Sequence, residues 1–201
     1  MNLFDLLFPK KCLECGREGK YICETCLAKV PTGDWVGNTY SVFKYQGVIR
    51  KAIIALKYKF ATDIVDELSK IIVDRIKMYD LRFKNATLVP IPLHRYRKNF
   101  RGFNQAEIIG KIIAQKMHWQ FEPNLLVKTV STLSQVGLKG SSRRSNLSGV
   151  FSVVFHKSLI INHKSILLFD DVYTTGSTIK EAKKVLEKAG FKNIRVLTLA
   201  R

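Results

Sequence analysis

The feature that most constrains the fold is an apolar run that ends in two acidic residues. Residues 166–169 are followed by Asp170 and Asp171, and then by a loop rich in threonine, glycine and serine. Four apolar residues in a row predict a strand that is covered on both faces, as in a parallel sheet. An amphipathic helical pattern follows over 178–190. Because ligands of open α/β sheets bind beyond the carboxyl ends of the strands, we expect a binding site here.

The loop after the acidic pair has the chemistry of a phosphate site. Backbone N–H groups at the start of a helix attract phosphate, and a glycine lets the backbone approach it closely. Two carboxylates suit the vicinal hydroxyls of a sugar, or the waters around a divalent cation, better than a bare phosphate. A ribose 5-phosphate is therefore expected, and a ligand-free helix cap is the alternative interpretation. The expected phosphate-binding residues are Thr174, Thr175, Gly176, Ser177 and Thr178.

This stretch resembles the 5-phosphoribosyl-1-pyrophosphate (PRPP) loop of type I phosphoribosyltransferases. The resemblance implies that Asp170 and Asp171 hold the ribose hydroxyls and that the loop holds the 5-phosphate. It also implies Mg²⁺ as the cation that accompanies PRPP. Whether the acidic pair serves catalysis or only binding is left open by the residues themselves.

The charge of the chain indicates a polyanionic partner. Its 201 residues favour one domain with a small appendage, and 34 Lys and Arg against 16 Asp and Glu give a net charge of +18. Acidic residues are missing between Asp80 and Glu107 and again between Glu122 and Asp170. Hydrophobic residues make up 46% of the chain, which is enough for a core and argues against global disorder.

Four cysteines near the N-terminus predict a metal site. Two CxxC pairs with seven residues between them are typical of a four-thiolate zinc centre in a reducing compartment. Two disulfides or an iron–sulfur centre are the alternatives. A zinc ion with four protein ligands would be structural. We expect a zinc-binding module over 1–34 and a phosphoribosyltransferase-like domain over 35–201. The expected ligands are Cys12, Cys15, Cys23 and Cys26.

Two basic segments are expected near the acidic pair. The first is a loop over 93–103, which follows a strand that Pro90 and Pro92 bring to an end. Its cations can hold pyrophosphate or a nucleic-acid backbone, and its aromatic side chains either stack on bases or belong to the core. The second is 131–148. It is interpreted either as a mobile loop that closes over pyrophosphate or as a surface loop without a role in binding. The cations concerned are Arg95, Arg97, Lys98, Arg101, Lys139, Arg143 and Arg144.

Periodicity predicts alternating strands and helices along the chain. The predicted strands are 40–45, 88–92, 125–130, 150–155, 166–169 and 194–198, and the predicted helices are 48–59, 62–79, 105–117 and 178–190. Lys57 is predicted on the solvated face of its helix. His94 is as compatible with a turn as with a ligand.

Several motifs together resemble the ComF family. They are PIPLHRYRKNFRGFNQAE, TLSQVGL, RRSN, LLFDDVYTTGST and the terminal VLTLAR, and they span most of the chain. The resemblance implies an α/β fold with a type I phosphoribosyltransferase-like parallel sheet flanked by helices. It also implies a part in natural transformation and DNA uptake, with a helicase and recombination-loading proteins as partners.

Three functions are compatible with these features. The expected one is binding of single-stranded DNA on a phosphoribosyltransferase scaffold that keeps a PRPP-type pocket. The alternative is an active transferase that uses PRPP and Mg²⁺, although no pocket for an acceptor is recognisable in the sequence. The third is an adaptor that docks a helicase through the zinc module. The start of the chain has no secretory signal, and the sequence has no bilayer-spanning run, so we expect a cytoplasmic protein with a loose attraction to the inner membrane.

Overall fold

The computed structural model describes residues 9–58, 63–78, 83, 86–129, 150–154 and 165–201. Its helices are α2 (Glu24–Ala28), α3 (Gly47–Tyr58), α4 (Ile64–Met78), α5 (Arg95–Arg101), α6 (Gln105–Met117) and α9 (Ser177–Lys188). Its strands are β1 (Trp35–Val36), β2 (Thr39–Phe43), β3 (Thr87–Pro90), β4 (Gln120–Phe121), β5 (Leu126–Lys128), β6 (Phe151–Val153), β7 (Ile166–Val172) and β8 (Ile194–Ala200). The predicted segments 131–148 and 1–8 lie largely or wholly outside the described residues.

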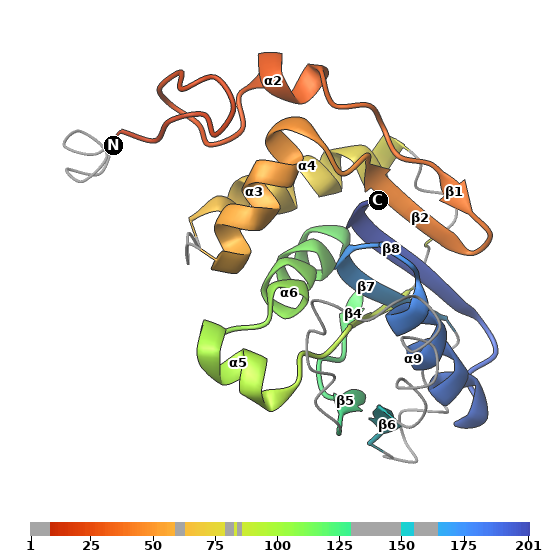
Figure 1. Cartoon of the computed structure of the whole chain (residues 1–201). Coiled ribbons are helices and arrows are strands. Elements are labelled where there is room, and N and C mark those ends of the chain that lie inside the picture. Colours follow the sequence, from red (N-terminus) through yellow and green to blue (C-terminus); the bar gives the residue numbers. More distant parts are fainter. Residues whose placement is uncertain (1–8, 59–62, 79–82, 84–85, 130–149, 155–164) are drawn as a thin grey trace.

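A six-stranded sheet forms the centre of the molecule, with the strand order β1-β2-β8-β7-β3-β4 (Figure 1). Only the edge strand β1 runs antiparallel to its neighbour, and all other neighbours in this sheet are parallel. The strand that carries the acidic pair, β7, lies between β8 and β3. The carboxyl ends of β8, β7 and β3 therefore meet at one edge, where a ligand is expected.

The two faces of β7 bury different clusters because successive side chains point to opposite faces. Leu167 and Phe169 belong to the cluster formed with α3, α4 and α6, and all three helices lie on that side of the sheet. Ile166 and Leu168 belong to the cluster with α9 and the small antiparallel sheet of β5 and β6. Both faces of the central strand are thus covered, as its unbroken apolar run predicts.

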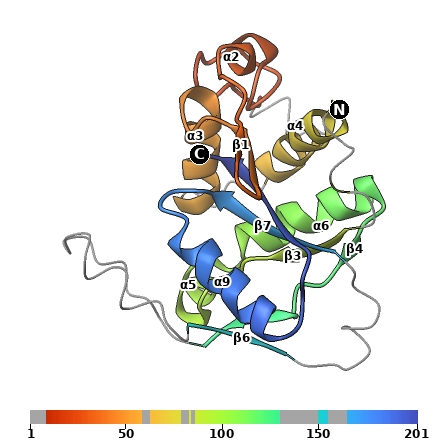
Figure 2. The same ribbon diagram turned by 90° about the vertical axis from the view of Figure 1, so that its right-hand side faces the viewer.

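The N-terminal segment packs on the helical side of the sheet. Three of its cysteines share an apolar cluster with residues of α3 and α4. In the second view α2 lies at the end of the molecule next to α3 (Figure 2). Glu67 of α4 fixes this contact, because its carboxylate accepts hydrogen bonds from the backbone N–H groups of Tyr21 (3.2 Å) and Ile22 (3.0 Å). The proposed boundary between 34 and 35 stays a prediction.

The predicted fold class is confirmed, and one local prediction is wrong. The segment 93–103 is not a loop, because residues Arg95–Arg101 form α5. His94 caps this helix by accepting a hydrogen bond from the backbone N–H of Tyr96, so it is a turn histidine. Gly102 ends the helix in the left-handed conformation, with φ 75°. Across the described helices, none is long and apolar enough to cross a membrane.

Candidate functional site

The loop between β7 and α9 presents a helix start to the carboxyl edge of the sheet. Gly176 is the N-cap of α9 and has φ 71°, a conformation that glycine adopts without strain. A Cβ atom here would collide with the ring of Tyr173. Glycine offers no side chain to cap the helix, so the first N–H groups of α9 can bind an anion. The hydroxyls of Thr175 and Ser177 lie 2.9 Å apart and both are at the surface of the loop.

The acidic pair lies inside β7 rather than beyond its end. Because side chains alternate along a strand, Asp170 faces the α9 side and Asp171 faces the side of α3 and α6. Asp171 is buried and forms an ion pair of 2.6 Å with Lys57, the next-to-last residue of α3. The prediction that Lys57 is a solvated charge is therefore wrong, since its side chain is only 20% exposed.

Asp170 has an unusual affinity for its proton. Burial and the neighbouring charge of Asp171 raise the pKa of the Asp170 carboxyl to about 8. The backbone N–H of Asp171, which donates to Asp170 Oδ1 at 2.8 Å, and the cation of Lys57 oppose this shift without overcoming it. At neutral pH one carboxyl of the pair therefore holds a proton. A Mg²⁺ ion or a sugar hydroxyl that prefers a carboxylate would displace that proton on binding.

A cavity of about 270 Å³ adjoins the acidic pair. It lies between the end of α3, the connection after β3, the start of α6 and the loop between β7 and α9, whose residues 174–178 are the predicted phosphate loop. No acceptor pocket is recognisable in the sequence, whereas this cavity is large enough for a small polar ligand. Its polar and charged lining consists of Lys57, Tyr58, Arg101, Asn104, Gln105, Lys128, Asp170, Asp171, Thr174 and Thr178.

The basic segment reaches the cavity through one of its predicted residues. Arg101 lines the cavity, and its guanidinium lies 5.4 Å from the ring centre of Tyr58. Lys98 instead pairs with Glu107 at 3.1 Å, which reduces the charge it offers to a ligand. Arg95 and Arg97 lie on α5, and Lys139, Arg143 and Arg144 fall outside the described residues. Two aromatics of α5 are open to solvent, with Tyr96 71% and Phe100 73% exposed.

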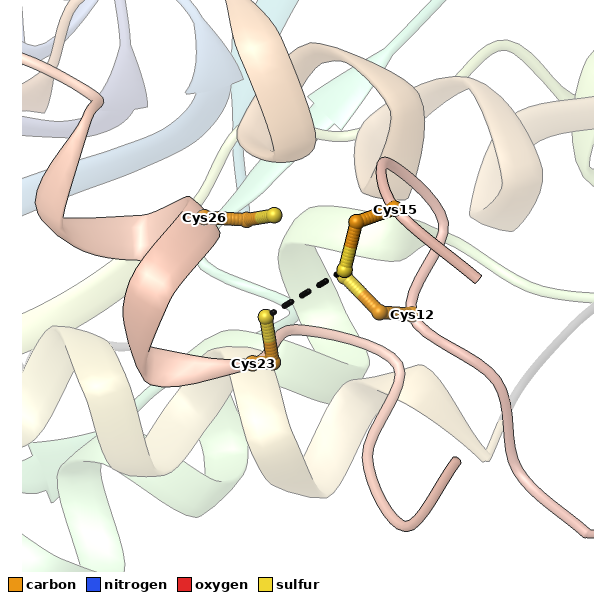
Figure 3. A group of neighbouring side chains, drawn as sticks. All are labelled: Cys12, Cys15, Cys23 and Cys26. Carbon is orange, nitrogen blue, oxygen red and sulfur yellow. Dashed lines mark hydrogen bonds between the residues drawn. The ribbon is translucent and has the colours of Figure 1, made fainter. Parts of the chain in front are cut away.

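The four cysteines form the second candidate site. Their sulfur atoms all lie within 4.8 Å of one another, and the side chains converge on one point (Figure 3). The sulfurs of Cys15 and Cys23 are 3.7 Å apart. A tetrahedral ion with zinc–sulfur bonds of about 2.3 Å requires sulfur–sulfur distances of about 3.8 Å, so the cluster fits Zn²⁺. With four thiolates as ligands there would be no open position for a substrate, so a zinc ion held here would be structural.

The backbone around the cluster favours a thiolate at Cys12. Burial alone would raise the pKa of Cys12, but hydrogen bonds from the backbone N–H groups of Cys15, Cys23 and Glu14 lower it to about 6. Burial and the three neighbouring sulfurs raise the pKa of Cys26 to about 12. The thiols of Cys12 and Cys26 thus differ strongly in pKa. A divalent cation would let all four ionise together.

Some residues of the site could not be found from the sequence. Lys57, Lys128, Asn104 and Gln105 come from elements that are far apart in the chain, and only the fold brings them to the acidic pair. A weak signal existed for Asn104, because an Asn before an apolar helical pattern predicts an N-cap. Its side chain does cap α6 by accepting from the backbone N–H of Ala106.

Comparisons with known proteins show which family the chain belongs to. Residues 105–201 match the family of phosphoribosyl transferase domains. Competence protein F of Haemophilus influenzae is 33% identical over 202 residues, and the alignment covers 94% of this chain and 84% of that protein. Competence protein ComFC of Streptococcus pneumoniae is 31% identical, covering 100% of this chain and 84% of that protein. DNA utilization protein YhgH of Escherichia coli K12 is 26% identical, covering 94% of this chain and 83% of that protein.

One solved structure shows a distant likeness. Glutamine phosphoribosylpyrophosphate amidotransferase from B. subtilis, in complex with ADP and GMP, aligns with a TM-score of 0.42 and 13% identity. The alignment covers 67% of this chain and 25% of that chain.

The parallel sheet, the loop after β7 and the matched domain together define a protein with a phosphoribosyltransferase-like fold. Two relatives are more than 30% identical to this chain over nearly its whole length, which narrows the assignment to one family. The chain belongs to the ComF family of competence proteins. Relatives named for competence and for DNA utilization support a role in natural transformation.

Proposed function

We propose that this protein binds single-stranded DNA during natural transformation and keeps a pocket for a phosphosugar of the PRPP type. The names of its relatives place this family in competence and DNA utilization, and the net charge of +18 suits a polyanion. That this chain contacts DNA directly is proposed from the chemistry of its surface.

The observation that carries the proposal is a set of exposed aromatic side chains, two on α5 and one, Tyr58, that lines the cavity. Tyr58, Tyr96 and Phe100 are 64%, 71% and 73% exposed, and Arg101 lies against the ring of Tyr58. Solvent-exposed rings beside cations are the surface on which single-stranded nucleic acids stack, because every base has an aromatic face. A purely structural role would cover such rings, as happens in part to Phe103, which is partly buried against the core.

The test is a binding titration with a labelled oligothymidylate at several salt concentrations. We expect the logarithm of the association constant to fall linearly with the logarithm of the salt concentration, with a slope of about −0.7 for each phosphate contacted. Phe100→Ala should weaken binding by about 5- to 100-fold and leave that slope unchanged, since stacking does not involve counterions. Affinity that does not depend on salt would exclude the electrostatic part of the proposal.

A matched control separates stacking from general loss of apolar surface. Met78 at the end of α4 is 72% exposed and lies on a different helix from Tyr96 and Phe100, so Met78→Ala should leave oligonucleotide binding unchanged. An equal loss in the Met78 and Phe100 variants would contradict a specific aromatic surface.

The second candidate function is a phosphoribosyltransferase that uses PRPP and Mg²⁺. It is favoured by the cavity of about 270 Å³ next to the acidic pair and the phosphate loop. Transfer at the anomeric carbon needs mainly positioning and neutralisation of the leaving pyrophosphate. Asp170→Ala combined with Asp171→Ala should abolish binding of PRPP with Mg²⁺, and unchanged affinity would exclude this pocket. Release of pyrophosphate with an acceptor would distinguish an enzyme from a PRPP-regulated binding protein.

Further partners remain expectations from the family resemblance. A competence helicase would dock on the zinc module, and recombination-loading proteins would act alongside it. The cytoplasmic location and the loose attraction to the inner membrane also stay predictions.

A further inference from the structure

One buried donor near the acidic pair lacks a partner. Gln105, the first residue of α6, is only 2% exposed, and its Nε2 atom has no hydrogen-bond partner among the described residues. Leaving a buried amide donor unpaired destabilises a protein, and most buried polar groups are therefore paired. An apolar side chain would fill this position without that penalty. The amide therefore calls for an explanation beyond packing.

The orientation of this amide is fixed by its neighbour. Arg101 donates from Nη1 to Gln105 Oε1 at 3.3 Å. A guanidinium has donors only, so the opposite orientation of the amide would set its NH₂ group against another donor. The oxygen of Gln105 is thus committed to Arg101, and the NH₂ group is the end that remains.

The backbone that carries Gln105 is also held in place. Asn104 donates from Nδ2 to the backbone oxygen of Ile91 at 3.0 Å, and its Oδ1 accepts from the N–H of Ala106. These bonds tie the start of α6 to the chain that leaves β3. Gln105 is therefore a rigidly positioned donor in the wall of the cavity that also contains Asp170 and Thr178.

The charges around this donor define what it can bind. Arg101 and Lys128 line the same cavity as cations, whereas Lys57 is neutralised by Asp171. A donor placed among cations favours an oxygen of an anion, and phosphoryl oxygens accept such bonds strongly. The phosphate loop joins the cavity through Asp170, Thr174 and Thr178, which border both. A phosphosugar held by that loop would extend its remaining substituents into the cavity.

We propose that Gln105 donates to a phosphoryl oxygen on the part of the ligand that lies away from the 5-phosphate loop. It would thereby discriminate a ligand with a second phosphoryl group, such as PRPP, from ribose 5-phosphate. The inference rests on the proposed phosphosugar pocket and adds a specificity-determining residue to it. A phosphate of a DNA strand that enters the cavity offers the same chemistry, so the test includes both sources.

The experiment is calorimetric titration of the full chain with PRPP and Mg²⁺, with ribose 5-phosphate and with an oligothymidylate. Gln105→Leu removes the donor at similar volume. We expect its affinity for PRPP to fall about tenfold, its affinity for ribose 5-phosphate to stay unchanged, and its thermal midpoint to stay equal or rise. A fall for the oligonucleotide and not for PRPP would identify a DNA phosphate as the ligand oxygen.

Two further variants keep the inference falsifiable. Gln105→Ala guards against misfolding of the leucine variant and should show the same selective loss. Gln115→Leu changes an exposed glutamine of the same helix and should bind all three ligands normally. Equal losses for PRPP and ribose 5-phosphate, or a lowered thermal midpoint with unchanged binding, would mean that Gln105 is structural. If the unaltered protein binds neither phosphosugar, the proposed pocket itself fails.

Discussion

The protonated state of Asp170 leads to a prediction about stability. Its carboxyl has a pKa of about 8 in the folded chain, against about 4 in an unfolded one. Between these values the folded state holds a proton that the unfolded state has released. This group therefore stabilises the folded state fully below about pH 4, and the contribution is lost as the pH rises towards 8. The substitution Asp170→Asn has the same shape and no titration.

The magnitude follows from the two pKa values. Each pH unit between them changes the free energy of unfolding by up to about 1.4 kcal/mol. From pH 5.5 to pH 7.5 the native protein should thus lose about 2 to 3 kcal/mol relative to Asp170→Asn. Contributions of titrating groups that do not interact with Asp170 cancel in that difference. Asp170→Asn should therefore be relatively more stable at pH 7.5 than at pH 5.5.

The assay is urea unfolding of both proteins, followed by circular dichroism at pH 5.5, 6.5, 7.5 and 8.5. Asp34→Asn is the matched control, because a hydrogen bond from Lys44 lowers the pKa of the Asp34 carboxyl and it stays ionised in both states throughout this range. The difference in free energy of unfolding between Asp34→Asn and the native protein should be constant with pH. A constant difference for Asp170→Asn as well would refute a proton on Asp170 and show that Lys57 keeps both carboxyls charged.

The other predictions concern the ion pair, the loop and the metal. Lys57→Met leaves Asp171 buried and unpaired and should lower the free energy of unfolding by about 3 kcal/mol. Lys51→Met breaks an exposed pair with Glu14 and should lower it by less than about 1 kcal/mol. Similar losses for the two variants in urea unfolding would contradict the difference in burial. Gly176→Ala should weaken ribose 5-phosphate binding at least tenfold by calorimetry, and normal affinity would argue against phosphate at this loop. Mass spectrometry should find one Zn²⁺ per chain, and chelation should lower the thermal midpoint of the whole chain; an unchanged midpoint would show that the metal does not support the core.

The sequence predicts the central strand well because its signal is local. An apolar run covered on both faces leaves few alternatives to a parallel sheet, and the loop with the acidic pair follows it directly. The cysteines were equally predictable, since a tetrahedral ion imposes the spacing of its own ligands. The α5 helix was missed because 93–103 has no apolar periodicity. It forms because His94 and Gly102 cap its ends.

The partners of the acidic pair could not be predicted, because they depend on tertiary contacts. On a helical wheel Lys57 lies close to Arg50, which is seven residues earlier on α3 and exposed. The end of α3 lies over the carboxyl edge of β7, and only this crossing converts Lys57 into a partner for Asp171. Likewise, nothing local to Gln105 indicates that it will line a cavity with Lys57 and Asp170, although Arg101, which donates to its oxygen, is only four residues away.

The position of the pair within β7 gives the site its two-sided chemistry. If both carboxylates lay in a loop after the strand, both could be ionised and could face the same ligand. Inside the strand they alternate, so Asp171 is bound by Lys57 on the α3 side while Asp170 keeps a proton on the α9 side. A ligand that uses both must release the proton and compete with Lys57.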